Sequence, residues 1–152
     1  MSAMWRELIQ TVAPEARFNE PAPAEAILAA EAGLGVRLPG ELRTLLSESD
    51  GVEGKFDAGV IWPVDVIRAQ NLTFRTRPDF RDLYMPFDCV LFFADAGDGG
   101  QFFYALHDGS VKRTDVFLWN QENDSRTWTA PSLRHYLEGW LSGRLKVGGR
   151  EV

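Results

Sequence analysis

The sequence has little of what metal sites and disulfide frameworks are built from. It contains a single cysteine, Cys89, which excludes an internal disulfide. Its two histidines, His107 and His135, lie in different predicted elements, and no zinc-binding signature surrounds them. We expect Cys89 to be a buried, inert thiol, because it lies inside the apolar run DCVLFF, a strand that offers no electropositive setting. The sequence therefore predicts no cofactor and no metal site.

Long apolar runs and excess positive charge are also missing. No apolar run approaches the ~20 residues that a membrane-spanning helix needs, and the first residues, MSAMWRELIQ, lack the pattern of a signal peptide. We therefore expect a cytoplasmic protein that does not insert into a membrane. The 16 Lys and Arg are outnumbered by 22 Asp and Glu, which gives a net charge of −6. This balance disfavours nucleic-acid binding and suits a basic protein partner, although it is equally typical of a surface that only keeps a protein soluble.

What the chain does have is the length and composition of one ordinary domain. It is 152 residues long, and 45% of them are hydrophobic and 12% aromatic, which is enough for a proper core. Residues 1–152 are therefore predicted to form a single domain, whose oligomeric state the sequence leaves open.

Residue patterns predict helices at both ends of the chain and strands between them. Helical spacing of apolar residues, together with capping residues, indicates helices at residues 5–12, 24–33, 39–50, 63–74 and 131–142. Aromatic and β-branched runs indicate strands at GVIW (59–62), DCVLFF (88–93), QFFYAL (101–106) and VFLWN (116–120). Strands joined by short turns must be antiparallel, because a parallel crossover needs about a dozen residues or more. We predict an α+β fold, an antiparallel sheet meander flanked by N-terminal helices and a C-terminal helix.

The predicted strands do not alternate cleanly between apolar and polar residues. Phe92 and Phe93, and then Phe102 and Phe103, place large rings on both faces of the sheet. Either both faces are covered, or one face holds a cleft.

The segment DAGDGG, which joins two of the strands, invites a catalytic or ligand-binding interpretation. It lacks the alternating acids and closing Glu of a calcium loop, and no Lys-Ser or Lys-Thr pair follows its glycines as in a phosphate-binding loop. A hairpin turn built on Gly97, Gly99 and Gly100 explains the composition instead. Ser132 and His135 lie three residues apart on the last helix, but no orienting acid accompanies them and Ser132 has the place of a helix cap. The residues therefore predict no enzyme activity.

Acidic residues gather at the turns that frame the predicted sheet. Asp95 and Asp98 lie on the first hairpin, and Glu122 and Asp124 lie on the next turn. Loop acids are usually only solvated, but this concentration would form a negative rim.

Two tryptophans are expected to be partly exposed beside these acids. Trp62 precedes a proline, and Trp128 lies in a polar stretch. Exposed tryptophans are typical of protein-binding hot spots. Together with the acids, they lead to a predicted partner-binding surface made of Trp62, Asp95, Asp98, Glu122 and Asp124.

An ordered set of motifs resembles one family. LGVRLPGELRTLLSESDG, IWPVDVIRAQN, MPFDCVLFFADAGDGGQFFYAL, VFLWNQEND and APSLRHYLEGWL occur in the order and at the approximate spacing of the Smi/Knr-type branch of the SUKH superfamily. The resemblance extends from Ala24 to Leu141. It implies an α+β domain with an antiparallel sheet and flanking helices, and it places DCVLFF and QFFYAL at the centre of the sheet.

The same resemblance implies a function. Bacterial members look like immunity proteins that bind and neutralise toxins, often nucleases, delivered between competing cells, and fungal relatives regulate cell-wall synthesis through protein partners. No member type suggests catalysis. Many members carry an acid directly after the loop glycines, where this chain has Gln101, and this departure weakens a role for a carboxylate there. We therefore expect a non-catalytic immunity protein that binds a cognate toxin domain through an acidic cleft and its loops. The alternative is a regulatory or scaffold domain that binds an endogenous protein or a small ligand.

Overall fold

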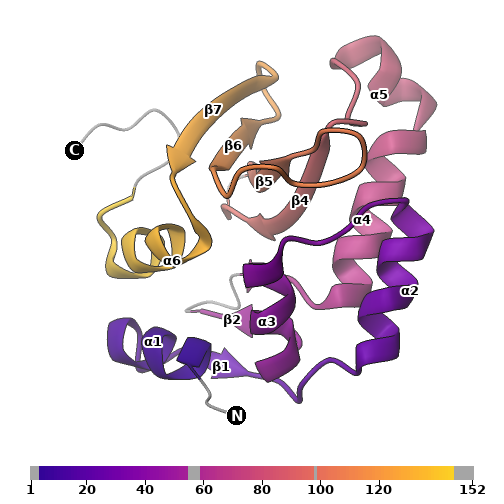
Figure 1. Ribbon diagram of the computed structural model, residues 1–152. Coiled ribbons are helices and arrows are strands. Elements are labelled where there is room, and N and C mark those ends of the chain that lie inside the picture. The colour runs from indigo at the N-terminus through magenta and orange to yellow at the C-terminus, as the bar shows by residue number, and fades with distance from the viewer. Residues whose placement is uncertain (1–3, 55–58, 98, 146–152) are drawn as a thin grey trace.

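The computed structural model describes residues 4–54, 59–97 and 99–145 (Figure 1). The helices are α1 (Met4–Val12), α2 (Ala24–Leu34), α3 (Gly40–Glu48), α4 (Val64–Thr76), α5 (Pro78–Leu83) and α6 (Leu133–Ser142). The strands are β1 (Arg17–Phe18), β2 (Val52–Glu53), β3 (Gly59–Ile61), β4 (Val90–Asp95), β5 (Gln101–Ala105), β6 (Val116–Asn120) and β7 (Ser125–Ala130). All strand pairs are antiparallel, so the predicted α+β class is confirmed.

The helices end and begin at residues suited to capping. Gly35 caps the C-terminal end of α2 with a left-handed φ of 67°, and Gly143 caps that of α6 with a φ of 86°. Ser132 caps the start of α6, because its hydroxyl accepts a hydrogen bond from the backbone amide of His135 at 3.2 Å. None of the helices in the described ranges is long and apolar enough to span a membrane.

The strands form two sheets rather than the single sheet expected from the sequence. One contains β1, β2 and β3, and the other is a meander of β4, β5, β6 and β7, each in that order. The expectation of a central position is therefore wrong for β4, which forms an edge of the larger sheet. The two sheets approach each other at this edge, where the amide of Trp62 donates to the carbonyl of Phe93 at 2.9 Å.

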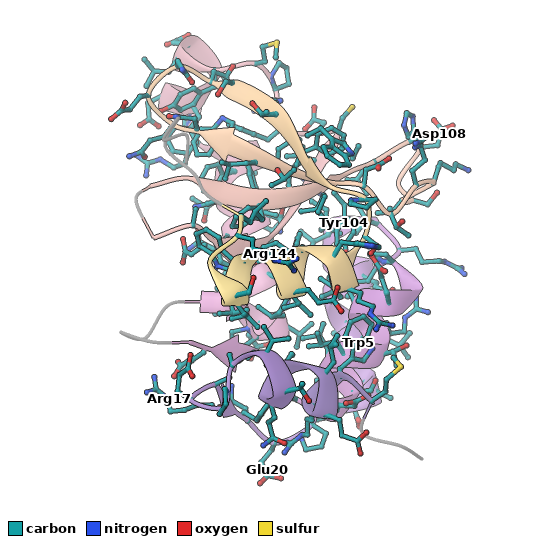
Figure 2. The ribbon with its side chains drawn as sticks, turned by 90° about the vertical axis from the view of Figure 1, so that its left-hand side faces the viewer. Trp5, Arg17, Glu20, Tyr104, Asp108 and Arg144 are labelled. Carbon is teal, nitrogen blue, oxygen red and sulfur yellow. The ribbon has the colours of Figure 1, made fainter. Side chains whose placement is uncertain are left out.

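One face of the four-stranded sheet, called the α6 face here, packs against α6. Phe93 and Phe102 contact the ring of Tyr136 at centroid distances of 5.5 and 4.7 Å, and Tyr104 lies beside Phe93. A bulge in β4 between Phe92 and Ala94 adds Phe93 to this face without a strand partner. In Figure 2, α6 lies between this sheet and α1.

The opposite face, called the α5 face, packs against α4, α5 and the segment that follows α5. Phe92 and Trp119 of the sheet surround Phe74 of α4, at centroid distances of 4.9 and 5.4 Å. Phe80 of α5 and Phe87 complete the cluster. Both faces are thus covered, which is one of the two arrangements that the paired phenylalanines allowed.

The outer edge of β4 is closed by a side chain of α4. Asn71 is buried, its Nδ2 donates to the carbonyl of Phe92 at 2.9 Å, and its Oδ1 accepts from the amide of Phe92 at 2.9 Å. The carboxamide of Asn71 therefore satisfies the two backbone groups that a neighbouring strand would otherwise satisfy.

Cys89 corrects an expectation from the sequence, because its thiol is exposed rather than buried. β4 begins one residue later, at Val90, whose side chain is buried. Cys89 itself lies in the turn that precedes β4, outside the strand whose side chains are covered on both faces of the sheet, and its thiol is left exposed.

Candidate functional site

Two turns of the four-stranded sheet lie side by side at one end of it. The first joins β4 to β5 (residues 96–100), and the second joins β6 to β7 (residues 121–124). Gly99 in the first turn has a φ of 96°, and a Cβ at this position would lie only 2.8 Å from Cδ of Gln121 in the second turn. The positive φ favours glycine at this position, and a Cβ here would displace the side chain of Gln121. Gly97 and Gly99 both have positive φ, which confirms the hairpin turn.

We call Asp95, Glu122 and Asp124, the acids in or directly beside these two turns, the acidic rim. Asp95 is the last residue of β4, and the other two lie in the second turn. Asp98 was predicted to belong to the same surface, but it lies outside the described residues.

Trp62 and Asp95 contact each other directly. Nε1 of Trp62 donates to Oδ2 of Asp95 at 3.1 Å. Gly59 leaves room for this pair, because a Cβ there would lie 3.1 Å from Cδ1 of Trp62. Trp62 is only 5% exposed, so the expectation of partial exposure is wrong at this position. Its N–H finds an acceptor within the fold, and burial of the large ring is then favourable.

Asp124 ties the second turn to the segment that follows α5. Its Oδ1 accepts from Nε1 of Trp119 at 2.8 Å and from Nη2 of Arg126 at 3.0 Å, while its Oδ2 accepts from the amide of Met85 at 2.9 Å. Arg126 completes the network by donating to the carbonyls of Met85 and Pro86 at 2.8 and 3.0 Å. Both oxygens of Asp124 are thus occupied within the fold.

This network sets the ionisation of Asp124. Partial burial alone would raise the pKa of its carboxyl, but the hydrogen bonds from Met85, Trp119 and Arg126, with the positive charge of Arg126, lower the pKa by more. The net effect is a pKa below the ordinary value, so the group is charged at neutral pH.

Glu122 is the exposed member of the acidic rim. Its backbone amide donates to Oδ1 of Asn120 at 2.8 Å, which fixes the turn, while its carboxylate has no partner among the described residues. Trp128 of β7 is 53% exposed, as expected, and its Nε1 donates to Oδ1 of Asp115 at 3.0 Å. Trp128 pairs in register with Phe117, away from the turn that carries Glu122.

Ser132 and His135 meet, but in the setting of a helix cap. Oγ of Ser132 and Nδ1 of His135 lie 2.7 Å apart, and the same hydroxyl accepts from the amide of His135. The acid of the next turn, Glu138, pairs with Arg134 at 3.1 Å. Across the described ranges, no three His, Cys, Asp or Glu side chains come together in a way that could hold a metal ion.

Glu41 has a role that the sequence did not indicate. Its Oε2 accepts from the hydroxyl of Tyr104 at 3.0 Å and from the amide of Leu133 at 3.1 Å, which links α3 to β5 and α6. Burial raises the pKa of Glu41, and the two hydrogen bonds oppose this rise without cancelling it. An acid in the first turn of a helix is already favoured by the helix dipole, so its presence gave no separate signal.

A pocket of about 350 Å³ lies between α4, α5 and residues 84–88. Aromatic rings form much of its lining, and its charged lining residues are Arg75, Arg81 and Asp88. It adjoins the second turn, because the hydroxyl of Tyr84 donates to the carbonyl of Gln121 at 3.0 Å. The sequence did not reveal this pocket, because α5 was not predicted.

Most of the chain matches a known protein family. A family model, SUKH_6, described as SMI1-KNR4 cell-wall, matches residues 24–137. A comparison with curated proteins gives no match. The matched range contains the acidic rim, Glu41 and the pocket between α4 and α5. Since the match covers most of the chain, this protein belongs to the SMI1-KNR4 family of the SUKH superfamily.

Proposed function

We propose that this chain is a non-catalytic immunity protein that binds and neutralises a cognate toxin domain through the acidic rim. Membership of the SUKH superfamily is compatible with this role. The observation that carries the proposal is the contact between Gly99 and Gln121, which joins two acid-bearing turns into one surface. In this view the binding site lies at the end of the sheet rather than along a face of it.

The residues of the acidic rim have different parts in the proposed surface. Glu122 offers an exposed carboxylate, and Asp95 retains Oδ1 beyond its bond to Trp62. Trp62 and Asp124 hold the two turns in position through their hydrogen bonds. Asp98 would add a third charge from the same turn as Gly99. Direct contact with the partner is therefore proposed for Asp95, Asp98 and Glu122, while Trp62 and Asp124 support them.

A nuclease is the class of toxin that the charge of the chain favours. A nuclease presents a basic surface to nucleic acid, and an acidic protein can be steered to that surface and occupy it. The net charge of −6 also attracts the chain to a basic surface.

A regulatory or scaffold domain that binds an endogenous protein is the second candidate. The description of the matching family as SMI1-KNR4 cell-wall favours this alternative. The same acidic rim would then bind a partner of the same cell.

Co-expression with the product of the adjacent gene tests the proposal. Wild-type protein should abolish the toxicity of that product and bind it in isothermal titration calorimetry. Glu122→Lys should weaken binding several-fold, chiefly by slowing association, and the difference should shrink at high salt. Glu15→Lys makes the same charge change at an exposed site between α1 and β1 and should bind like the wild type.

The possible results separate the two candidates. A toxic neighbour that is neither bound nor neutralised contradicts the immunity role for that pair. Binding to a non-toxic neighbour supports the regulatory alternative. Equal weakening by Glu122→Lys and Glu15→Lys contradicts the assignment of the binding surface to the acidic rim.

A further inference from the structure

We propose that the pocket between α4, α5 and residues 84–88 binds a small aromatic carboxylate. Figure 1 shows α5 beyond the end of α4, on the side away from the three-stranded sheet. The volume of about 350 Å³ lies in the lower part of the range that small-molecule sites occupy. It suits a ligand of one or two rings. The proposal stands independently of toxin binding.

The aromatic part of the lining is formed by Phe74, Phe80, Tyr84 and Phe87. The angles between neighbouring ring planes in this group run from 53° to 84°, so none of these rings stacks on another. Inclined rings form an apolar wall against which the flat face or the edge of a further ring can pack.

Two guanidinium groups next to these rings are already neutralised. Nη2 of Arg77 lies 2.8 Å from Oδ2 of Asp79, and Nη2 of Arg126 lies 3.0 Å from Oδ1 of Asp124. Neither arginine lines the pocket.

The two arginines that do line the pocket lack a comparable partner. Arg81 is exposed and has no hydrogen bond or ion pair within the described part of the chain. Arg75 donates from Nη1 to the carbonyl of Leu34 at 2.9 Å and from Nη2 to that of Val90 at 3.4 Å, but its Nε is buried without an acceptor. A buried donor of this kind is normally satisfied.

One acid, Asp88, opposes these positive charges. Burial lowers the pKa of Arg75, and the negative charge of Asp88 acts in the opposite direction, so the two groups interact. The lining of the pocket thus carries two positive charges and one negative charge, on a chain whose net charge is −6. An excess of positive charge in this place favours an anion.

An aromatic carboxylate can interact with both the aromatic wall and the positive charges of the pocket. Its ring packs against the aromatic wall, and its carboxylate accepts hydrogen bonds from the guanidinium donors of Arg75 and Arg81. A cation would face two guanidinium groups. A neutral apolar molecule would leave the positive charges of Arg75 and Arg81 without an anionic partner in the pocket.

Titration of naphthalene-2-carboxylate into the full-length, ¹⁵N-labelled chain tests the proposal by NMR. We expect saturable shifts concentrated on the amides of residues 74–88, with a dissociation constant below about 1 mM. Naphthalene-2-carboxamide, a neutral molecule of the same shape, should bind about tenfold more weakly, because it carries no negative charge to form an ion pair with a guanidinium group. The absence of saturable shifts, or equal affinity for the two probes, overturns the proposal.

Three variants at charged residues sharpen this test. Arg81→Gln should weaken binding of the carboxylate several-fold, and Asp88→Asn should tighten it, because the first removes a favourable charge and the second an opposing one. Arg37→Gln changes an exposed arginine outside the pocket lining and should bind like the wild type. Unchanged affinity in both Arg81→Gln and Asp88→Asn would contradict the assigned site.

Discussion

The α6 face and the α5 face of the same sheet use similar aromatic side chains but differ in how they are closed. On the α6 face, Phe102, Tyr104 and Tyr136 are 0% exposed. Both phenol groups have an acceptor, since Tyr136 donates to the carbonyl of Val60 at 2.8 Å and Tyr104 donates to Glu41. This face is therefore a closed core whose buried hydroxyls are satisfied.

The α5 face is covered by α4 and, beside it, by a much smaller element, α5. α5 buries none of its residues, and Leu83 and Met85 beside the pocket are 66% and 57% exposed. A helix of six residues has little stability of its own, so its position depends on tertiary contacts. These contacts are the ring packing of Phe80 and the hydrogen bonds that Tyr84 and Met85 make to the second turn.

The difference between the faces shows that aromatic content alone does not decide what a surface does. The α6 face joins the sheet to α3 and α6 through fully buried rings. The α5 face leaves a pocket, exposed apolar side chains and two arginines, Arg75 and Arg81, that form no salt bridge in the described part of the chain. We therefore assign stability mainly to the first face and ligand binding to the second.

Removal of one ring from each face gives the largest expected contrast. Phe102→Ala removes a fully buried ring that contacts Tyr136 and Trp140, and should lower the free energy of unfolding by about 3–5 kcal/mol. Phe80→Ala removes a partly buried ring and should cost about 1 kcal/mol. Urea unfolding curves measure both values. Equal losses of unfolding free energy in the two variants would contradict the assignment of stability mainly to the α6 face.

Asp124→Asn tests the network that holds the α5 face to the second turn. The substitution removes the ion pair with Arg126 and replaces one acceptor oxygen by a donor, so either the amide of Met85 or Trp119 and Arg126 lose their acceptor. We expect a loss of about 1.5–3 kcal/mol in the free energy of unfolding at neutral pH.

The pH dependence of the same variant provides an independent check. Because the pKa of Asp124 in the folded protein lies below its ordinary value of 3.8, the group stabilises the fold above that value. This contribution is lost as the pH falls through the folded pKa. The wild type should therefore lose more stability than Asp124→Asn on acidification below about pH 5. If the free energy of unfolding falls equally in the wild type and in Asp124→Asn at acid pH, Asp124 is not the titrating group.

Glu41→Gln is expected to have the smallest effect, on the closed α6 face. Glutamine keeps an acceptor for Tyr104 and Leu133, so the free energy of unfolding should change by less than about 1 kcal/mol, whereas Glu41→Ala should cost about 1–3 kcal/mol. Since the folded pKa of Glu41 is raised, the stability that this group contributes falls as the pH rises through its ordinary and folded values. The glutamine variant should lack this fall. If Glu41→Gln and Glu41→Ala lower the free energy of unfolding equally, the side-chain oxygen at position 41 does not stabilise the fold as an acceptor.

Elements with a strong apolar pattern could be predicted from the sequence, and weakly patterned ones could not. The apolar stripe of Leu42, Leu45 and Leu46 marked α3, and all three side chains are buried. β7 was not predicted because SRTWTA is largely polar, and only Ala130 within it is buried. α5 is too short for a helical period to be visible over its six residues.

The candidate site was predictable only at the level of its turns. The glycines between β4 and β5 and the acids of both turns were visible in the sequence. Their contact depends on Gly99 and Gln121, which are far apart along the chain and whose proximity no local pattern reports. Trp62 was expected to be partly exposed because it precedes a proline, whereas the acceptor that allows its indole to be buried, Asp95, comes from β4, 33 residues further along the chain.

The bond between Asn71 and the backbone of Phe92 has a consequence for assembly. An unprotected edge strand can recruit a strand of another molecule, which leads to sheet extension or aggregation. On β4 this route is blocked, because the carboxamide of Asn71 already occupies the amide and the carbonyl of Phe92. The other edge strand is β7. A partner that adds a strand to this sheet would therefore join it along β7, beside the exposed Trp128.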